Sequence, residues 1–217
     1  MRVVKDFSRL AKNTTMNLTH KQREILSTAT TMFCQKGYVE TSMRDLAVCH
    51  QVKAASFYSH FKSKVDILTH ICEQIYEVMQ DGEKRIESYE GSDIDRFKNY
   101  VRRHLEVVIT NFESFQVYYK YRHLVDEEQY SKYRELDLKY HQMITQIMIS
   151  AFPLLKQNIS LRPEGAVIIL VDFLNCIPHH INPENPQIDR VIEDIQSRLT
   201  VCLLWPSLDE AEYKQKP

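Results

Sequence analysis

The sequence predicts an all-α protein of about nine helices, and three observations support this. Apolar residues recur at helical spacing along most of the chain, and no segment alternates with the two-residue period of a strand. The 217 residues include only 4 Gly and 7 Pro, too few glycines for the turns of β-sandwich, β-barrel and Rossmann folds. Helix-start patterns also precede most of the apolar stripes, which divides the chain into helices of ordinary length.

The first two expected helices have clear start signals. Thr19 begins a capping-box pattern ahead of an apolar stripe, and this helix ends at Gly37, a residue suited to a left-handed helix end. A second start follows at Thr41 or Ser42, with Asp45 as its capping partner, and this helix has room for about two turns.

A third short helix is expected over residues 53–60. Two short helices joined by a tight turn make a helix-turn-helix, here over about residues 42–61. Such a motif places its second helix in the major groove of DNA.

Six further helices follow, and most of them have a start signal of their own. Ser63, Ser92 and Asp126 suit helix N-termini, and Pro163 suits a first turn. The expected ranges are about 64–90, 92–110, 112–123, 127–152, 163–177 and 186–205, followed by a frayed tail.

Charge is unevenly distributed, although the chain as a whole carries a net −1. Residues 1–65 hold 11 Lys or Arg against 4 Asp or Glu, a net +7, and the remainder carries −8. A basic end joined to an acidic body favours a polyanion-binding module on a body with another task. Chance clustering of solvated charges is the alternative.

No apolar run reaches 18 residues, and residues 1–17 lack the apolar core of a secretory signal. Five scattered cysteines without a C-x-x-C pattern favour reduced packing residues. We therefore expect a cytoplasmic protein with no membrane partner.

An ordered series of motifs covers the N-terminal quarter of the chain. It comprises Arg23-Glu24-Ile25-Leu26, Gly37-Tyr38, Thr41-Ser42-Met43-Arg44-Asp45-Leu46-Ala47 and Phe57-Tyr58-Ser59-His60-Phe61-Lys62-Ser63-Lys64. This series resembles the DNA-binding domain of TetR-family (TetR/AcrR) transcriptional regulators. The resemblance implies a homodimer whose larger domain binds a small-molecule effector.

The resemblance divides the chain into four parts. Residues 1–18 form a basic, flexible arm, and residues 19–64 form the helix-turn-helix DNA-binding domain. Residues 65–205 form the effector-binding and dimerisation domain, and residues 206–217 form the C-terminal tail.

Three positions depart from the family pattern. Gln51 stands where glycine is usual in the turn, and it can adopt a positive φ only at an energetic cost. Lys53 replaces a small hydroxyl residue at the start of the recognition helix, and Val65 replaces a common glutamate. These departures leave the contacts of the recognition helix open.

The expected DNA contacts fall into three groups. The start of the second helix has free N–H groups that favour a phosphate, and the small residues of the third helix suit the major-groove floor. Tyr58 and Lys64 suit phosphates, whereas Lys53 suits a base edge. The predicted DNA-binding residues are Thr41, Ser42, Arg44, Lys53, Ala54, Ala55, Ser56, Tyr58, Ser59, His60 and Lys64. Helix capping by Thr41 or Ser42 and packing by Tyr58 are the alternatives.

Aromatic residues with a few polar neighbours gather in the larger domain, a composition typical of small-molecule sites. The candidate effector contacts are His104, Phe115, Tyr118, Tyr119, Tyr140, Met143 and Asn175. Ordinary core packing is the alternative for each of them.

The expected helices over 163–177 and 186–205, the eighth and ninth, carry wide apolar faces and are the predicted dimer interface. Twofold symmetry then predicts a palindromic operator in double-stranded DNA, with recognition helices about 34 Å apart. A small, largely apolar effector would shift the population toward a spacing that does not fit the operator. The predicted function is therefore a ligand-responsive transcriptional repressor.

Two other classes stay open: a DNA-bound adaptor whose partner is another protein, and a helical enzyme. No histidine has a glutamate three positions before it, and H-E-x-x-H, G-x-S-x-G and nucleotide-binding loops are absent from the sequence. We therefore expect no catalytic residue, no metal and no cofactor.

Overall fold

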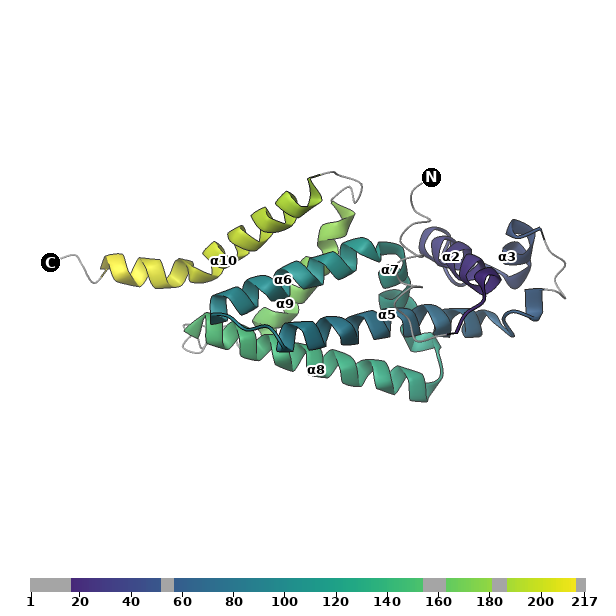
Figure 1. The fold of residues 1–217 in the computed structure, drawn as a ribbon, viewed down its shortest axis with the longest axis horizontal. Coiled ribbons are helices and arrows are strands. Elements are labelled where there is room, and N and C mark those ends of the chain that lie inside the picture. The colour runs from purple at the N-terminus through teal and green to yellow at the C-terminus, as the bar shows by residue number, and fades with distance from the viewer. Residues whose placement is uncertain (1–16, 52–56, 154–162, 181–186, 214–217) are drawn as a thin grey trace. The chain divides into compact units, whose positions relative to one another are not determined.

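The computed structural model describes residues 17–51, 57–153, 163–180 and 187–213. These ranges contain eight α-helices, two short 3-10 helices and no strand, which confirms the predicted all-α class (Figure 1). The α-helices are α2 (His20–Gln35), α3 (Met43–Cys49), α5 (Lys64–Glu87), α6 (Asp93–Thr110), α7 (Phe112–Tyr121), α8 (Glu127–Ala151), α9 (Pro163–Cys176) and α10 (Ile188–Tyr213). The third expected helix, over 53–60, lies largely outside the described residues.

Most of the residues predicted to begin helices do cap a helix N-terminus in the structure. Thr19 and Ser42 each make a complete capping box at the start of α2 and α3. The side chains of Ser63, Ser92 and Asp126 each accept a hydrogen bond from the backbone N–H three residues later, at the starts of α5, α6 and α8. Local capping chemistry therefore fixes where most of these helices begin.

Two helix ends differ from the prediction. The sixth expected helix stops at Tyr121, and a 3-10 helix over Arg122–Leu124 follows it. The last helix, α10, continues to Tyr213, so the expectation of a frayed tail directly after Trp205 was wrong. After Pro206, Leu208, Glu210, Ala211 and Glu212 are good helix formers, which continue the helix despite the missing proline N–H.

The chain packs as two compact units. Unit 1 comprises residues 1–81 and 110–136, and unit 2 comprises residues 82–109 and 137–217. Both α5 and α8 therefore run from one unit into the other. This division by packing does not test the functional boundary that we placed after residue 64, which stays a prediction.

Each unit has a core of its own. In unit 1, α2 packs against α3 and α7. Leu46, Ala47, Phe57 and Phe61 are buried there. In unit 2, one hydrophobic cluster joins residues of α6, α8, α9 and α10.

Candidate nucleic-acid interface

The start of α3 is an exposed helix N-terminus held by its capping box. The backbone N–H of Asp45 donates to Ser42 Oγ over 3.1 Å, and the Ser42 backbone N–H donates to the Asp45 carboxylate over 2.8 Å. The Ser42 backbone N–H and then the Ser42 hydroxyl, which both donate to the carboxylate, lower the pKa of Asp45, so its side chain holds the cap in its charged form. Arg44 lies exposed in the first turn. The alternative of helix capping is therefore confirmed for Ser42, and its contact with a phosphate stays a prediction.

Unlike Ser42 and Arg44, Thr41 is not exposed at the start of α3. Its side chain is fully buried, and its hydroxyl donates to the carbonyl of Gly37 over 2.8 Å. The buried hydroxyl is not available to a phosphate, so the geometry gives no support to a DNA contact through this side chain, and the predicted contact of Thr41 stays a prediction. Thr41 instead closes the loop that follows Gly37, whose φ of +100° confirms the predicted left-handed helix end.

Three of the predicted DNA-binding residues, Tyr58, Ser59 and His60, lie in the described segment after the turn. Phe57 is buried, whereas Tyr58 and Ser59 are exposed and His60 is half-buried. The His60 carbonyl accepts a hydrogen bond from the Gln22 side chain over 3.3 Å, which ties this segment to α2. The exposure of Tyr58 is what a phosphate contact through its hydroxyl requires. The remaining predicted residues, Lys53, Ala54, Ala55 and Ser56, lie outside the described residues.

The turn of the motif has the strain expected from its sequence. Gln51 has a φ of +53°, the left-handed region that glycine occupies at lower cost. Its backbone N–H donates to the Val48 carbonyl over 3.0 Å and so continues the end of α3 into the turn. The departure from glycine therefore keeps the turn conformation and adds strain to it.

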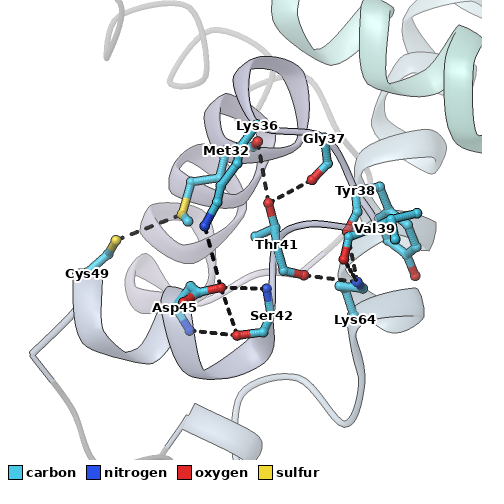
Figure 2. Close-up of polar contacts among 10 residues, drawn as sticks. All are labelled: Met32, Lys36, Gly37, Tyr38, Val39, Thr41, Ser42, Asp45, Cys49 and Lys64. Atoms are coloured by element: carbon cyan, nitrogen blue, oxygen red, sulfur yellow. Dashed lines mark hydrogen bonds and ion pairs between the residues drawn. The ribbon is translucent and has the colours of Figure 1, made fainter.

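Lys64 has an internal role that the sequence did not indicate. Its ammonium donates to the carbonyls of Tyr38, Val39 and Thr41 over 2.8, 3.3 and 2.9 Å (Figure 2). It also lies 4.4 Å from the centroid of the Tyr38 ring. These contacts engage all three N–H donors of the ammonium, so the geometry does not support the phosphate contact that we predicted for this residue.

The candidate effector residues separate into two groups. His104, Tyr140, Met143 and Asn175 belong to unit 2, and the three aromatic residues of α7 belong to unit 1. Among the latter, Phe115 and Tyr118 are buried and Tyr119 is 39% exposed. The Tyr118 ring packs edge-on against Tyr133 at 5.5 Å between centroids, as core aromatic residues do.

Three residues of the unit 2 group form a buried polar network. His104 Nδ1 lies 2.8 Å from the hydroxyl of Tyr140, and Nε2 lies 3.0 Å from Asn175 Oδ1. Because Oδ1 is an acceptor, Nε2 carries the imidazole proton and Nδ1 accepts from the Tyr140 hydroxyl. Burial lowers the pKa of His104 to about 4, so the ring is neutral at physiological pH.

Sequence reasoning missed Gln74 on α5. Its side chain is fully buried, and neither its amide nitrogen nor its amide oxygen has a hydrogen-bond partner in the part of the chain that the structure describes. An unpaired buried amide is costly and is the kind of group that a ligand can satisfy. A signal was present in the sequence, because Gln74 falls at stripe spacing between Ile71 and Val78.

One face of α9 is apolar and exposed. Ile168, Ile169 and Phe173 are 51%, 62% and 50% exposed, although Val167 and Leu170 on the same helix are buried in the core of unit 2. Val201 on α10 is exposed as well. Apolar residues gathered on one helix in this way are typical of a protein interface.

Within the described ranges, no group of three or more His, Cys, Asp or Glu residues could hold a metal ion. Among the same residues, no helix is both long and apolar enough to cross a membrane.

Comparison with known proteins identifies the N-terminal motif. Residues 25–71 match the model of bacterial regulatory proteins of the tetR family. The HTH-type transcriptional repressor KstR2 of Mycolicibacterium smegmatis is 27% identical over 113 residues. That alignment covers 48% of this chain and 55% of the relative, about half the length of each.

Solved structures share the fold over most of the chain. A TetR-family transcriptional regulator from Bordetella parapertussis superposes with a TM-score of 0.73 at 16% identity, covering 85% of this chain and 94% of that one. AibR, solved in complex with isovaleryl coenzyme A and operator DNA, superposes with a TM-score of 0.66 at 17% identity, covering 84% and 97%.

The capped α3 and the turn at Gln51 are the described part of the predicted helix-turn-helix, a motif of DNA-binding transcription regulators. Residues 25–71 therefore resemble the DNA-binding part of tetR-family regulators, and the fold of the chain is similar to that of a solved TetR-family regulator.

Proposed function

We propose that the chain is a ligand-responsive transcriptional repressor of the bacterial cytosol that binds a palindromic operator as a homodimer. The observation that carries the proposal is the match of residues 25–71 to the tetR family, on a motif with an exposed Arg44 and Tyr58. KstR2, the relative in sequence, is named as a transcriptional repressor. The basic N-terminal third of the chain supports an electrostatic attraction to DNA.

The dimer is supported by the exposed apolar face of α9. A lone copy would leave Ile168, Ile169 and Phe173 half or more in water, whereas a second copy related by twofold symmetry would cover the same face on both chains. We propose α9 and α10, the eighth and ninth helices of the sequence prediction, as this interface. The paired recognition helices would then enter successive major grooves, which requires a palindromic site.

The effector is proposed to be a small molecule with a largely apolar body. AibR was solved with isovaleryl coenzyme A, which supports a response to a small molecule in a protein of this fold. Besides the candidates from the sequence, Gln74 is a proposed effector contact, because its buried amide offers one donor and one acceptor. Binding would shift the population toward a conformer that does not fit the operator.

The operator can be found by selecting duplexes from a random DNA library with the purified protein. We expect an enriched palindrome with half-site centres about 10 base pairs, or a multiple of that, apart. Arg44→Ala should lower the slope of log K against log salt by about 1.8 per dimer, one phosphate contact in each half-site. Arg134→Ala, which removes an exposed arginine of α8, is the matched control and should keep the wild-type slope. Enrichment of no sequence and a salt-independent affinity would contradict the proposal.

A further inference from the structure

Lys64 connects the loop before α3 to the first residue of α5. The three carbonyls that accept from its ammonium belong to residues 38, 39 and 41, so they cover most of the loop between α2 and the Ser42 cap (Figure 2). The same loop is closed from within by the Thr41 hydroxyl on the Gly37 carbonyl. Loop and lysine therefore behave as one hydrogen-bonded assembly, which we name the Lys64 clamp (Lys64 with residues 37–41).

We propose that Lys64 is a positioning residue for DNA binding: it fixes the N-terminus of α3 to the start of α5 and does not itself contact DNA. The inference rests on the proposed DNA-binding function and deepens it. Because α5 begins at Lys64, any movement of the α5 start is transmitted through the clamp to Ser42 and Arg44. The clamp would thus keep the phosphate-binding end of α3 in register with α5.

The surroundings of the clamp favour positioning over phosphate binding. The ammonium lies against the face of the Tyr38 ring, which packs on Phe33 at 5.0 Å and on Tyr121 at 5.6 Å between centroids. A charge-assisted hydrogen bond is roughly twice as strong as a neutral one, and here three of them converge on one ammonium. The bonds to the Tyr38 and Thr41 carbonyls are part-buried and the bond to the Val39 carbonyl is exposed, so reaching a phosphate would cost Lys64 contacts that water replaces only in part.

Two substitutions separate the two roles. Lys64→Arg keeps the positive charge, but the planar guanidinium cannot place three N–H donors on three converging carbonyls. Lys64→Met keeps the aliphatic stem and removes every donor. The matched control is Lys62→Met, which removes the same charge from an exposed lysine two residues earlier.

The experiment measures affinity for the selected duplex at a temperature where circular dichroism shows every variant folded. We expect both Lys64 variants to bind at least 10-fold more weakly than the wild type, with no rescue by arginine. Hydrogen exchange on the free protein should show faster exchange of the α3 amides in both variants, with α2 unchanged. Lys62→Met should keep the wild-type exchange pattern.

Opposite outcomes overturn the inference. Affinity of Lys64→Arg close to the wild type, together with a reduced salt slope for Lys64→Met, would show a phosphate contact. Unchanged α3 exchange in both variants would show that the clamp does not hold α3. Failure of the wild type to bind any duplex would instead contradict the proposed function, and the exchange measurement would still test the clamp.

Discussion

The imidazole of His104 accepts a hydrogen bond from Tyr140 through Nδ1 and donates one to Asn175 through Nε2, and together they form a closed polar network inside the core of unit 2. Every nitrogen of the ring is satisfied in its neutral form. A proton added to Nδ1 would remove the acceptor that the Tyr140 hydroxyl uses and would create a buried charge. The network therefore stabilises unit 2 only while the ring is neutral.

The first prediction concerns the pH dependence of stability. The folded pKa of His104 is about 4, below its ordinary value of 6.5, so the unfolded state binds more protons between these values. The stabilisation is complete above pH 6.5 and is lost as pH falls toward 4, by about 3 kcal/mol in all. Urea unfolding at a series of pH values would measure this loss.

The control for this prediction is the same titration in two variants. His104→Gln can still donate and accept but does not titrate, so its stability should fall less between pH 6.5 and 4. His180→Gln, at an exposed histidine of the same unit, should keep the full dependence. Identical pH profiles for His104→Gln and the wild type would show that another group is responsible.

The second prediction concerns the buried amide of Gln74. Removing a buried polar group that has no partner relieves its desolvation penalty, so Gln74→Met should raise the free energy of unfolding by about 1–3 kcal/mol. Gln80→Met on the same helix is the control, because the Gln80 amide donates to the Tyr76 hydroxyl over 2.8 Å. That variant should not be stabilised.

The same substitution also tests the proposed effector contact. Gln74→Met should weaken release of the repressor by its effector and leave the affinity for operator DNA unchanged. A loss of stability in Gln74→Met would contradict both expectations, since it would mean that the amide is already satisfied in the free protein.

The sequence predicted most helix starts because capping is local chemistry. The pairs Ser42 with Asp45 and Ser92 with Asp95 lie three residues apart, and their hydrogen bonds form within one turn. The role of Lys64 could not be found in this way, because its acceptors lie 23 to 26 residues earlier in the chain. Contacts of that kind depend on tertiary packing, which periodicity and spacing do not encode.

The candidate effector residues also show that local sequence patterns do not predict tertiary contacts. Helical spacing indicated that Phe115 and Tyr118 share a helix with other aromatic residues, but it could not distinguish a packed core from a binding cavity. The structure shows both side chains buried and brings only His104, Tyr140 and Asn175 into a polar network. The long separation of 71 residues between His104 and Asn175 again explains why local patterns could not pair them.

The third prediction concerns the dimer. Ile169→Glu and Phe173→Glu place charges on the exposed face of α9 and should split the dimer without unfolding the protomer. Charged substitutions at Ile195 or Leu199, suggested by the α10 stripe alone, are a poorer test, because both residues pack against the core of unit 2. They should lower thermal stability as well as dimerisation.

Sedimentation velocity and thermal unfolding together distinguish these outcomes. Leu138→Glu is the matched control, since Leu138 is 58% exposed on α8, outside the α9 face. It should remain dimeric. Dimers of unchanged strength in both Ile169→Glu and Phe173→Glu would remove α9 from the interface.

The last prediction concerns the turn of the helix-turn-helix motif. Gln51 occupies the left-handed region with a φ of +53°, which costs a residue with a side chain about 1 kcal/mol or more. Gln51→Gly removes that strain but gives the unfolded chain more freedom, so we expect a net stabilisation of about 0.5–1 kcal/mol. Gln51→Ala keeps the Cβ and should gain almost nothing.

Because glycine keeps the turn conformation, Gln51→Gly should also retain operator affinity, whereas Gln51→Pro, restricted to a negative φ, should abolish it. Thermal unfolding and operator titration of the three variants would check this, and equal stabilisation by alanine and glycine would show that the strain does not arise from φ.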